Sequence, residues 1–259
     1  CHKHYYTDQT DNYLQKNYQL LLNHSFSTAW NLNVALHYTK GDGYYEEYKP
    51  GSSLVEYGLK PFNPDGTETN ESDLVRQKKM DNKFGGGVFS LNYTGNRLTA
   101  SLGGGLNQYR GNNFGKVTWV KNYIGNLSPE HEYYRNKSKK TDGNIYLKAN
   151  YDLTSTLSAY ADLQYRHIDY TIDGVNDKYD WNKNALRPLA VDKKFDFFNP
   201  KVGLNWNITP HHRLYASFSV AQKDPTRNNY TDGDPDAYPK AEKLRDYEAG
   251  YAFANPWVT

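Results

Sequence analysis

The chain has 259 residues, enough for one large β domain or two ordinary domains. Its 31 Lys and Arg nearly balance its 29 Asp and Glu, so charge gives no reason to expect nucleic acid or another strongly charged partner. The longest aliphatic run is Leu20-Leu21-Leu22, whereas a membrane-spanning helix needs about 20 consecutive apolar residues. A transmembrane β-barrel remains open, because its lipid-facing side uses only every second residue.

Two further features of the composition narrow the class. Cys1 is the only cysteine, which excludes an internal disulfide and disfavours small secreted scaffolds. Because the chain starts at Cys1 and shows no signal peptide, we expect a piece of a longer protein, with a lipid-modified cysteine as the alternative. The 25 tyrosines are typical of the aromatic girdles of a membrane barrel, or of a Tyr-rich soluble sheet or sugar-binding surface.

Strict alternation of apolar and polar residues predicts pairs of β-strands joined by tight turns. Along the chain the paired segments are 18–26 with 30–38, 89–94 with 98–106, 144–151 with 157–166, and 202–208 with 214–220, followed by a single strand at 247–253. Gly103 to Gly105 predict a bent strand or a close backbone approach. Lys16 and His24 lie on the same strand face as the apolar residues Leu20 and Leu22. They fall near the two membrane interfaces, where a charged side chain costs little free energy.

The segments between these pairs, 40–84, 108–142, 171–194 and 222–244, lack sustained periodicity and are expected to be long loops. Tight turns that alternate with long loops are typical of outer-membrane barrels, which have short periplasmic turns and long extracellular loops. The sequence therefore predicts an all-β, antiparallel, up-and-down transmembrane β-barrel segment. About nine strands of roughly 10 residues are expected, with residues 1–259 forming part of one barrel domain.

Two motifs near the C-terminus carry a resemblance to a known family. The stretch 215–225 (YASFSVAQKDP) is followed by a Pro-x-x-Glu element that leads into Tyr-Glu-x-Gly-Tyr. This pattern resembles the barrel of TonB-dependent outer-membrane receptors, with segments 144–170 and 41–47 similar to Bacteroides-type iron-uptake members. The motif positions are Pro239, Glu242, Tyr247, Glu248, Gly250 and Tyr251.

The resemblance implies a bacterial outer-membrane protein within a 22-stranded barrel closed by an N-terminal plug. It also implies TonB-energised uptake of a large scarce solute, chiefly a ferric siderophore or other iron complex, with haem and cobalamin as further options. The expected partners are the TonB complex through the plug, the iron complex, and outer-membrane lipid or lipopolysaccharide. The plug, the TonB box and the remaining strands are not found in this sequence. A passive porin and a soluble glycan-binding or adhesion module are the alternatives.

Aromatic, histidine and arginine residues in the expected outer loops are candidates for ligand contact, because such side chains recognise anionic and planar groups. Packing between loops or membership of the outer girdle is the alternative for about half of them. The candidates are Tyr44, Tyr45, Tyr48, Arg110, Trp119, His131, Tyr133, Tyr134 and Arg135.

On the polar face of segment 144–170, Lys148, Asp162, Gln164 and Arg166 are expected to face the lumen or the plug. Pairing Tyr151 with Leu157 places Lys148 opposite Tyr160 and diagonal to Asp162. These side chains are interpreted as a wet polar wall, with an anionic-ligand site at Arg166 as the alternative.

Catalytic and metal motifs are weak in this sequence. We find no nucleophile elbow, phosphate loop or zinc spacing, so an enzyme and a resident cofactor are not expected. Asp232, Asp234 and Asp236 have the one-three-five spacing of a calcium loop. Ala237 and Lys243 replace the glycine and glutamate that an EF-hand needs, so loose loop calcium is the only metal hypothesis.

Overall fold

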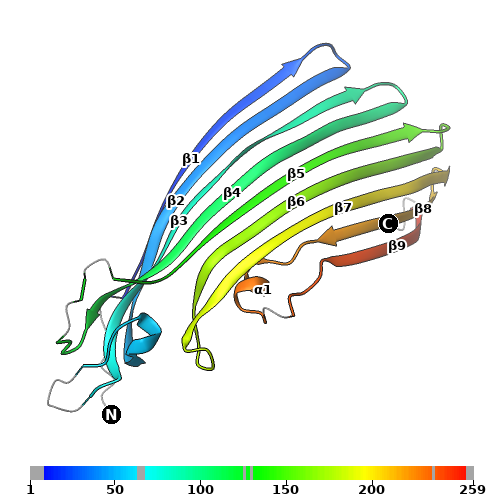
Figure 1. The fold of residues 1–259 in the computed structure, drawn as a ribbon. Helices are drawn as coiled ribbons and strands as arrows, with labels where there is room; N and C mark the ends of the chain where they lie inside the picture. The colour runs from blue at the N-terminus through cyan, green and yellow to red at the C-terminus, as the bar shows by residue number, and fades with distance from the viewer. Residues whose placement is uncertain (1–8, 63–67, 125–126, 129–130, 235–236, 255–259) are drawn as a thin grey trace.

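The computed structural model of the protein describes residues 9–62, 68–124, 127–128, 131–234 and 237–254. Within these residues, nine antiparallel strands form one curved sheet and follow one another in chain order (Figure 1). The strands are β1 (Thr10–Ser25), β2 (Trp30–Ser53), β3 (Glu71–Thr94), β4 (Leu98–Val120), β5 (Glu132–Asp152), β6 (Leu157–Asp180), β7 (Ala185–Thr209), β8 (His212–Lys223) and β9 (Glu242–Phe253). A 3₁₀ helix, η1 (Leu54–Tyr57), and a short α-helix, α1 (Arg227–Thr231), complete the described elements.

The up-and-down arrangement confirms the predicted fold class. Tight turns at 26–29, 95–97, 153–156 and 210–211 gather at one end of the sheet (Figure 1). The strand ends that flank the connections 54–70, 121–131, 181–184 and 224–241 lie at the other end. In the described part of the chain the sheet does not close, and β1 and β9 form its two edges.

The prediction of loops throughout 40–84, 108–142 and 171–194 was wrong, as was the prediction of strands of roughly 10 residues, whereas the loop predicted at 222–244 is confirmed by the connection 224–241. Most of 40–84, 108–142 and 171–194 is strand, and β2, β3 and β6 each have 24 residues. The third expected loop is a hairpin that turns at 181–184. Above the lipid, the outward side chains meet water, so the outward hydrophobic alternation ends while the hydrogen-bond ladder continues. Loss of periodicity therefore marked the edge of the lipid contact and not the end of the strands.

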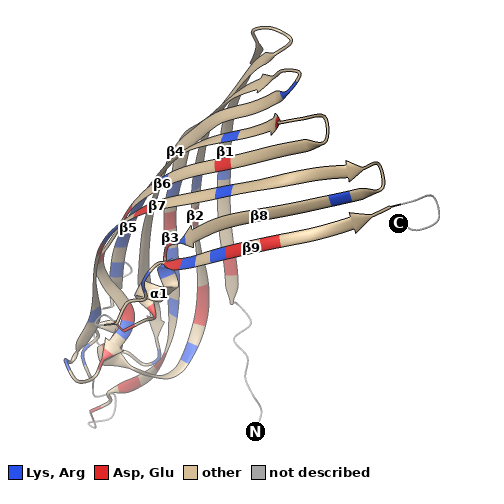
Figure 2. Ribbon diagram, turned by 90° about the vertical axis from the view of Figure 1, so that its right-hand side faces the viewer, with Lys and Arg blue, Asp and Glu red and all other residues tan. Residues whose placement is uncertain are grey.

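One face of the sheet, here the outward face, carries the predicted apolar residues. Leu147, Leu163 and Leu204 are 48%, 38% and 49% exposed, so they do not pack into a buried centre. Aromatic pairs occupy both limits of this band, with Tyr18 and Tyr38 at one limit and Trp30 and Tyr93 at the other. The opposite, concave face, here the lumen face, carries the alternate residues. Along the strands, most Lys, Arg, Asp and Glu lie in the half of the sheet away from the tight turns (Figure 2). Neither described helix is long and apolar enough to cross a bilayer.

The register of the central hairpin differs from the predicted one by two residues. Tyr151 pairs with Ala159, which sets Lys148 directly opposite Asp162. The Lys148 Nζ–Asp162 Oδ2 distance is 3.5 Å. In the turn at 153–156, Thr154 accepts a hydrogen bond from the Leu157 amide at 2.9 Å and donates one to the Leu157 carbonyl at 3.1 Å. The prediction placed the turn at 152–156, which begins one residue too early, since the last register pair before the turn is Asp152 with Ser158.

Several glycines inside the strands lie directly under a tyrosine ring of the neighbouring strand. At Gly203, an added Cβ would lie 2.4 Å from the Tyr160 ring, and at Gly250, 2.3 Å from the Tyr215 ring. Gly103 is the same case with Tyr146, and its added Cβ would also lie 2.8 Å from the Phe89 carbonyl oxygen, which favours the predicted close backbone approach over a bent strand. A ring that covers a cross-strand glycine restores packing that the missing side chain forfeits. The directly opposed pairs are Tyr13–Gly43, Tyr38–Gly85, Tyr146–Gly103, Tyr160–Gly203 and Tyr215–Gly250.

These glycines predict a selective cost for adding one methyl group. We expect Gly203→Ala to destabilise the intact protein by about 1–3 kcal/mol, because the Tyr160 ring must leave its position. Gly143→Ala is the matched control, since its Cβ would meet Leu106 at an ordinary 3.4 Å. Urea unfolding of both variants in detergent measures the difference. Equal stabilities for the two variants would show that the ring contact contributes nothing.

Candidate functional site

Two short segments fold back over the lumen face near the end opposite the tight turns. The 3₁₀ helix η1 packs through Leu54 and Tyr57 against Leu74, Val117 and Tyr133. His131 Nε2 lies 2.6 Å from the Tyr57 carbonyl oxygen, which fixes η1 to the start of β5. This cluster buries apolar side chains on the lumen face.

The helix α1 forms the second cover, over β6 and β7. Tyr230 is 1% exposed and packs with Ile168, Ile172 and Phe197, which all point to the lumen face. Its ring meets Tyr170 edge to face at 5.8 Å. Burial, followed by the nearby Asp224, raises the pKa of the Tyr230 hydroxyl, so Tyr230 is neutral at physiological pH.

A cluster of charges joins this cover to the strand wall. Asp224, 7% exposed, accepts a hydrogen bond from Lys140 Nζ at 2.6 Å and lies 3.8 Å from Arg166 Nη1. Arg166 also donates from Nε to Asp142 at 3.0 Å. Arg227 of α1 donates to Asn136 of β5 at 2.8 Å. The connection 224–241 is thus held on the lumen face by charge-assisted bonds as well as by apolar packing.

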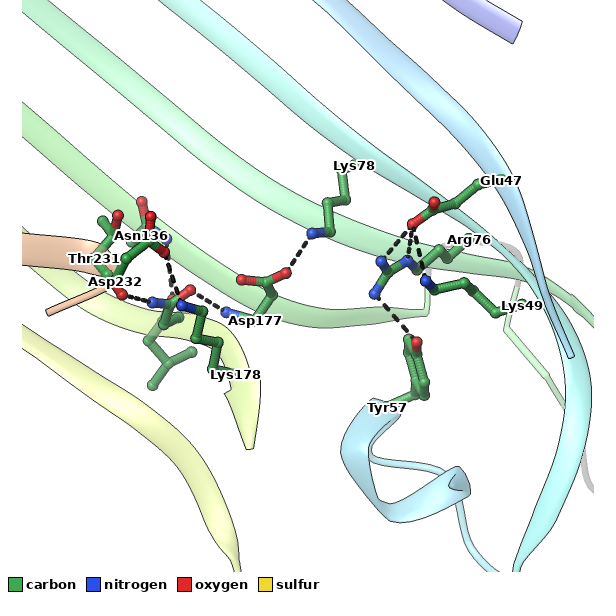
Figure 3. A network of polar contacts seen from close by, with 12 residues as sticks. Glu47, Lys49, Tyr57, Arg76, Lys78, Asn136, Asp177, Lys178, Thr231 and Asp232 are labelled. Carbon is green, nitrogen blue, oxygen red and sulfur yellow. Dashed lines mark hydrogen bonds and ion pairs between the residues drawn. The ribbon is translucent and has the colours of Figure 1, made fainter. Parts of the chain in front are cut away.

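A further set of polar contacts crosses the lumen face near η1 (Figure 3). Arg76 donates from Nε to Glu47 at 2.6 Å and from Nη1 to the Tyr57 hydroxyl at 3.2 Å. Lys78 of β3 forms an ion pair with Asp177 of β6, although β4 and β5 lie between these strands in the sheet (Figure 3). The upper end of β6 therefore leans across the concave face.

Beside these contacts lies an aromatic groove of about 490 Å³. Tyr13, Tyr45 and Tyr134 supply rings to it from β1, β2 and β5, and Lys78 supplies a cation. Lys78 Nζ stands 5.9 Å from the centroid of the Tyr45 ring, within cation–π range. We call this the lumen groove; its lining also includes Asp11, Asn12, Gly43, Tyr44, Lys79, Met80 and Asn113. Rings combined with a cation suit a planar anionic solute.

The structure distributes the candidate ligand residues among three places. Tyr45 and Tyr134 line the lumen groove, while Tyr133 and His131 hold η1. The other candidates lie at outward-facing strand positions: Tyr44, Tyr48, Arg110, Trp119 and Arg135. Their placement in loops was wrong, because β2, β4 and β5 continue through these positions. His131 alone directly precedes a strand.

Several outward-facing candidates have partners of their own. Lys79 lies over the Tyr44 ring at 5.1 Å, and the Tyr48 hydroxyl donates to Asp73 at 2.5 Å. Arg135 stacks over Phe114 at 4.1 Å. These contacts favour packing of the upper wall for this subset, which was the alternative stated from the sequence.

The predicted lumen residues occupy the lumen face. Lys148 and Asp162 form a pair, Gln164 accepts from Asn199 at 3.3 Å, and Arg166 belongs to the Asp224 cluster. Because each has a protein partner, the polar-wall interpretation gains support, and a ligand role for Arg166 stays a prediction.

The calcium hypothesis gains no support from the geometry. Asp232 forms an ion pair with Lys178 at 2.8 Å, and Asp236 lies outside the described residues. Within the described ranges, no three His, Cys, Asp or Glu residues gather closely enough to hold a metal ion.

The family motif lies on β9 and just before it. Pro239 precedes the strand, Glu242 opens it, and Gly250 lies under the Tyr215 ring. Tyr247 and Tyr251 point outward, where Tyr247 packs on Phe218 at 4.9 Å and Tyr251 bonds His212. Glu248 faces the lumen, 3.5 Å from the Ser217 hydroxyl. The motif therefore builds the wall and does not contact the lumen groove.

Sequence reasoning missed Tyr13, Arg76, Lys78 and Asp224. For the part of β6 that α1 covers, the sequence does contain a signal. Apolar residues occupy odd positions up to Tyr165 and then even positions at 168, 170 and 172. This switch marks a strand that continues while its buried face changes from lipid to lumen. Lys78 and Asp177 had no such signal, since their contact spans strands that are not neighbours.

The outward apolar band, the aromatic limits, the polar lumen face and the meander topology together define a section of a transmembrane β-barrel. The family model described as "TonB dependent receptor-like, beta-barrel" matches residues 2–259. The chain belongs to this family of outer-membrane receptors, and the bacterial outer membrane is its location. A comparison with curated protein sequences gives no match.

Solved structures of low sequence identity share the fold. The Escherichia coli K12 ferric-catecholate import receptor Fiu, in its open form, has a TM-score of 0.60 at 15% identity, covering 86% of this chain and 38% of Fiu. The Acinetobacter baumannii siderophore receptor PiuA has a TM-score of 0.58 at 12% identity, covering 96% and 39%. The Yersinia pestis ferric yersiniabactin uptake receptor FyuA has a TM-score of 0.57 at 10% identity, covering 97% and 35%. The chain thus spans less than two fifths of each of these receptors.

The Asp224 cluster predicts that one carboxylate holds the connection 224–241 in place. We expect Asp224→Asn to weaken this docking by about 1–3 kcal/mol, because Lys140 and Arg166 lose a buried counter-charge. Hydrogen–deuterium exchange across 227–238 in the intact protein should accelerate accordingly. Asp232→Asn is the control, since its ion pair with Lys178 is exposed and contributes little. Unchanged exchange in Asp224→Asn would contradict the assignment.

Proposed function

We propose that the protein is the ligand-binding wall of a receptor that carries a ferric siderophore or another iron complex across the outer membrane, with energy from TonB. The lumen groove is the observation that carries the proposal, because it combines three tyrosine rings with a lysine on the concave face. Such a surface complements the aromatic, anionic ligands that enclose ferric iron. Fiu, PiuA and FyuA, which share the fold, are by name receptors for iron complexes.

The rest of the receptor completes this role in the proposal. A 22-stranded barrel contains this wall as part of one domain, and a plug inside it carries the TonB box. The open sheet and the coverage of less than two fifths of Fiu are consistent with additional strands. Outer-leaflet lipid or lipopolysaccharide surrounds the outward face. Family membership favours this reading over a passive porin or a soluble glycan-binding module. The similarity to Bacteroides-type iron-uptake members stays a prediction.

Binding of iron complexes to the intact receptor tests the proposal. We expect Tyr45→Ala and Lys78→Gln to weaken binding of the transported complex about tenfold or more, because each removes a groove contact with the solute. Tyr48→Ala provides a matched control: Tyr48 also lies on β2 but does not line the lumen groove, and its hydroxyl donates to Asp73 at 2.5 Å. Its affinity should match that of the unmodified receptor.

Growth identifies the solute itself. A deletion strain supplied with a panel of ferric catecholates, hydroxamates, citrate, haem and cobalamin should lose growth on at least one iron source and regain it with the intact gene. Growth on every source without the gene, together with no binding by the purified receptor, would contradict the proposed uptake.

A further inference from the structure

The outward face carries a straight row of cations that the uptake role leaves unused. Successive register pairs place Lys16 opposite Lys40, Lys40 opposite Lys83, Lys83 opposite Arg110, and Arg110 opposite Lys139. All five side chains are exposed. We call these residues the basic row; it crosses five neighbouring strands, β1 to β5, on one face.

Like charges directly opposite one another destabilise a sheet. Neighbouring strands are about 4.8 Å apart, so each cation of the basic row has another cation within the reach of its own side chain. Among the five, Arg110 also donates to Gln108 at 2.8 Å, a neutral partner. An array of this kind is stabilised by a partner that brings several negative charges together.

The position of the basic row shows which side that partner comes from. One step toward the tight turns, the same face reads Tyr18, Tyr38, Gly85, Gln108 and Thr141, without charge. One step away, it carries Asp42, Asp81 and Lys137. On β1 to β5 the basic row is therefore the last charge before the lipid band. Beyond the end of the row, Asp169 of β6 lies opposite Thr141 and forms an ion pair with Lys194 at 3.6 Å.

The basic row also climbs out of the membrane. The aromatic residue at the upper limit of the apolar band is Tyr38 in β2 and Tyr165 in β6. Following the paired residues from Tyr165 across β5, β4 and β3 leads to Val34 in β2, four residues below Tyr38. This difference of four residues corresponds to about 13 Å along a strand. Lys16 thus lies at the rim, and Lys139 lies well above it, so the partner must present anions at more than one depth.

A depression of about 500 Å³ lies at the upper end of the basic row. Lys83, Arg110, Lys137 and Lys139 line it, together with Asp81 and Asp173. Its size admits a phosphorylated sugar, and its cations lie on adjacent strands, as a group with several phosphate oxygens requires.

We propose that the basic row binds the phosphate groups of an outer-leaflet phosphorylated glycolipid, with the acyl chains against the apolar band below. The inference rests on the proposed contact with outer-leaflet lipid and does not depend on which solute is carried. Each lysine or arginine near an anionic membrane surface contributes about 1 kcal/mol, so the array acts as one multivalent site.

Native mass spectrometry of the intact receptor with bisphosphorylated lipid A tests the assignment. We expect the triple variant Lys83→Gln, Arg110→Gln, Lys139→Gln to bind this lipid at least tenfold more weakly than the unmodified receptor. Dephosphorylated lipid A should bind both proteins weakly and equally. The triple variant Lys60→Gln, Lys121→Gln, Lys183→Gln removes the same charge from the connections and should retain full binding.

Other outcomes overturn the proposal. Equal lipid A binding by the basic-row variant and the unmodified receptor would remove it, and so would displacement of the lipid by excess inorganic phosphate alone, which indicates a small-anion site. Should the triple variant fail to fold, Lys16→Gln with Lys40→Gln tests the lower end, and Lys83→Arg with Lys139→Arg should keep binding. Iron-complex binding, measured on the same preparations, should be unchanged; its absence in the unmodified receptor would contradict only the uptake role.

Discussion

The need to pair every backbone amide and carbonyl inside hydrocarbon governs this structure. A sheet meets that need only through hydrogen bonds between neighbouring strands, which leaves the side chains free to differ between the two faces. Within the band, alternate residues such as Leu147 and Leu204 face outward, and Lys148 and Asp162 face inward. Above the band the ladder persists without the alternation, and the strands continue as a polar wall.

The lumen face departs from a uniformly polar lining where the chain folds back onto it. Ile168 and Ile172 would be exposed to water in an open barrel, but α1 and Tyr230 cover them. At the other side, η1 does the same for Leu74 and Val117. Apolar patches thus attach the connections, and charged contacts such as Asp224 with Lys140 set their position. The lumen groove lies where β1, β2 and β3 remain uncovered by α1.

The sequence predicted the fold class, the number of strands and which residues face outward or toward the lumen. These follow from lipid contact, because it requires an apolar residue at every second position of a strand. The sequence also predicted that Gly103 marks a close approach, which the Tyr146 ring explains. Most strand lengths were missed, since backbone pairing above the lipid does not continue the outward apolar alternation; for β6 alone, the switch of apolar residues to positions 168, 170 and 172 records the continuation. The candidate site was predicted only in part. Tyr45 and Tyr134 belong to the groove, but contacts such as Lys78 with Asp177 depend on sheet curvature, which no local pattern records.

The length of the central strands has a consequence for access. At about 3.3 Å per residue and a tilt of about 40°, the 24 residues of β6 rise roughly 60 Å, against an apolar band about 25 Å tall. The far end of β6 consequently stands on the order of 30 Å above the acyl chains. The covers formed by η1 and α1 therefore lie outside the hydrocarbon, where the lumen face is reached from water and not from lipid.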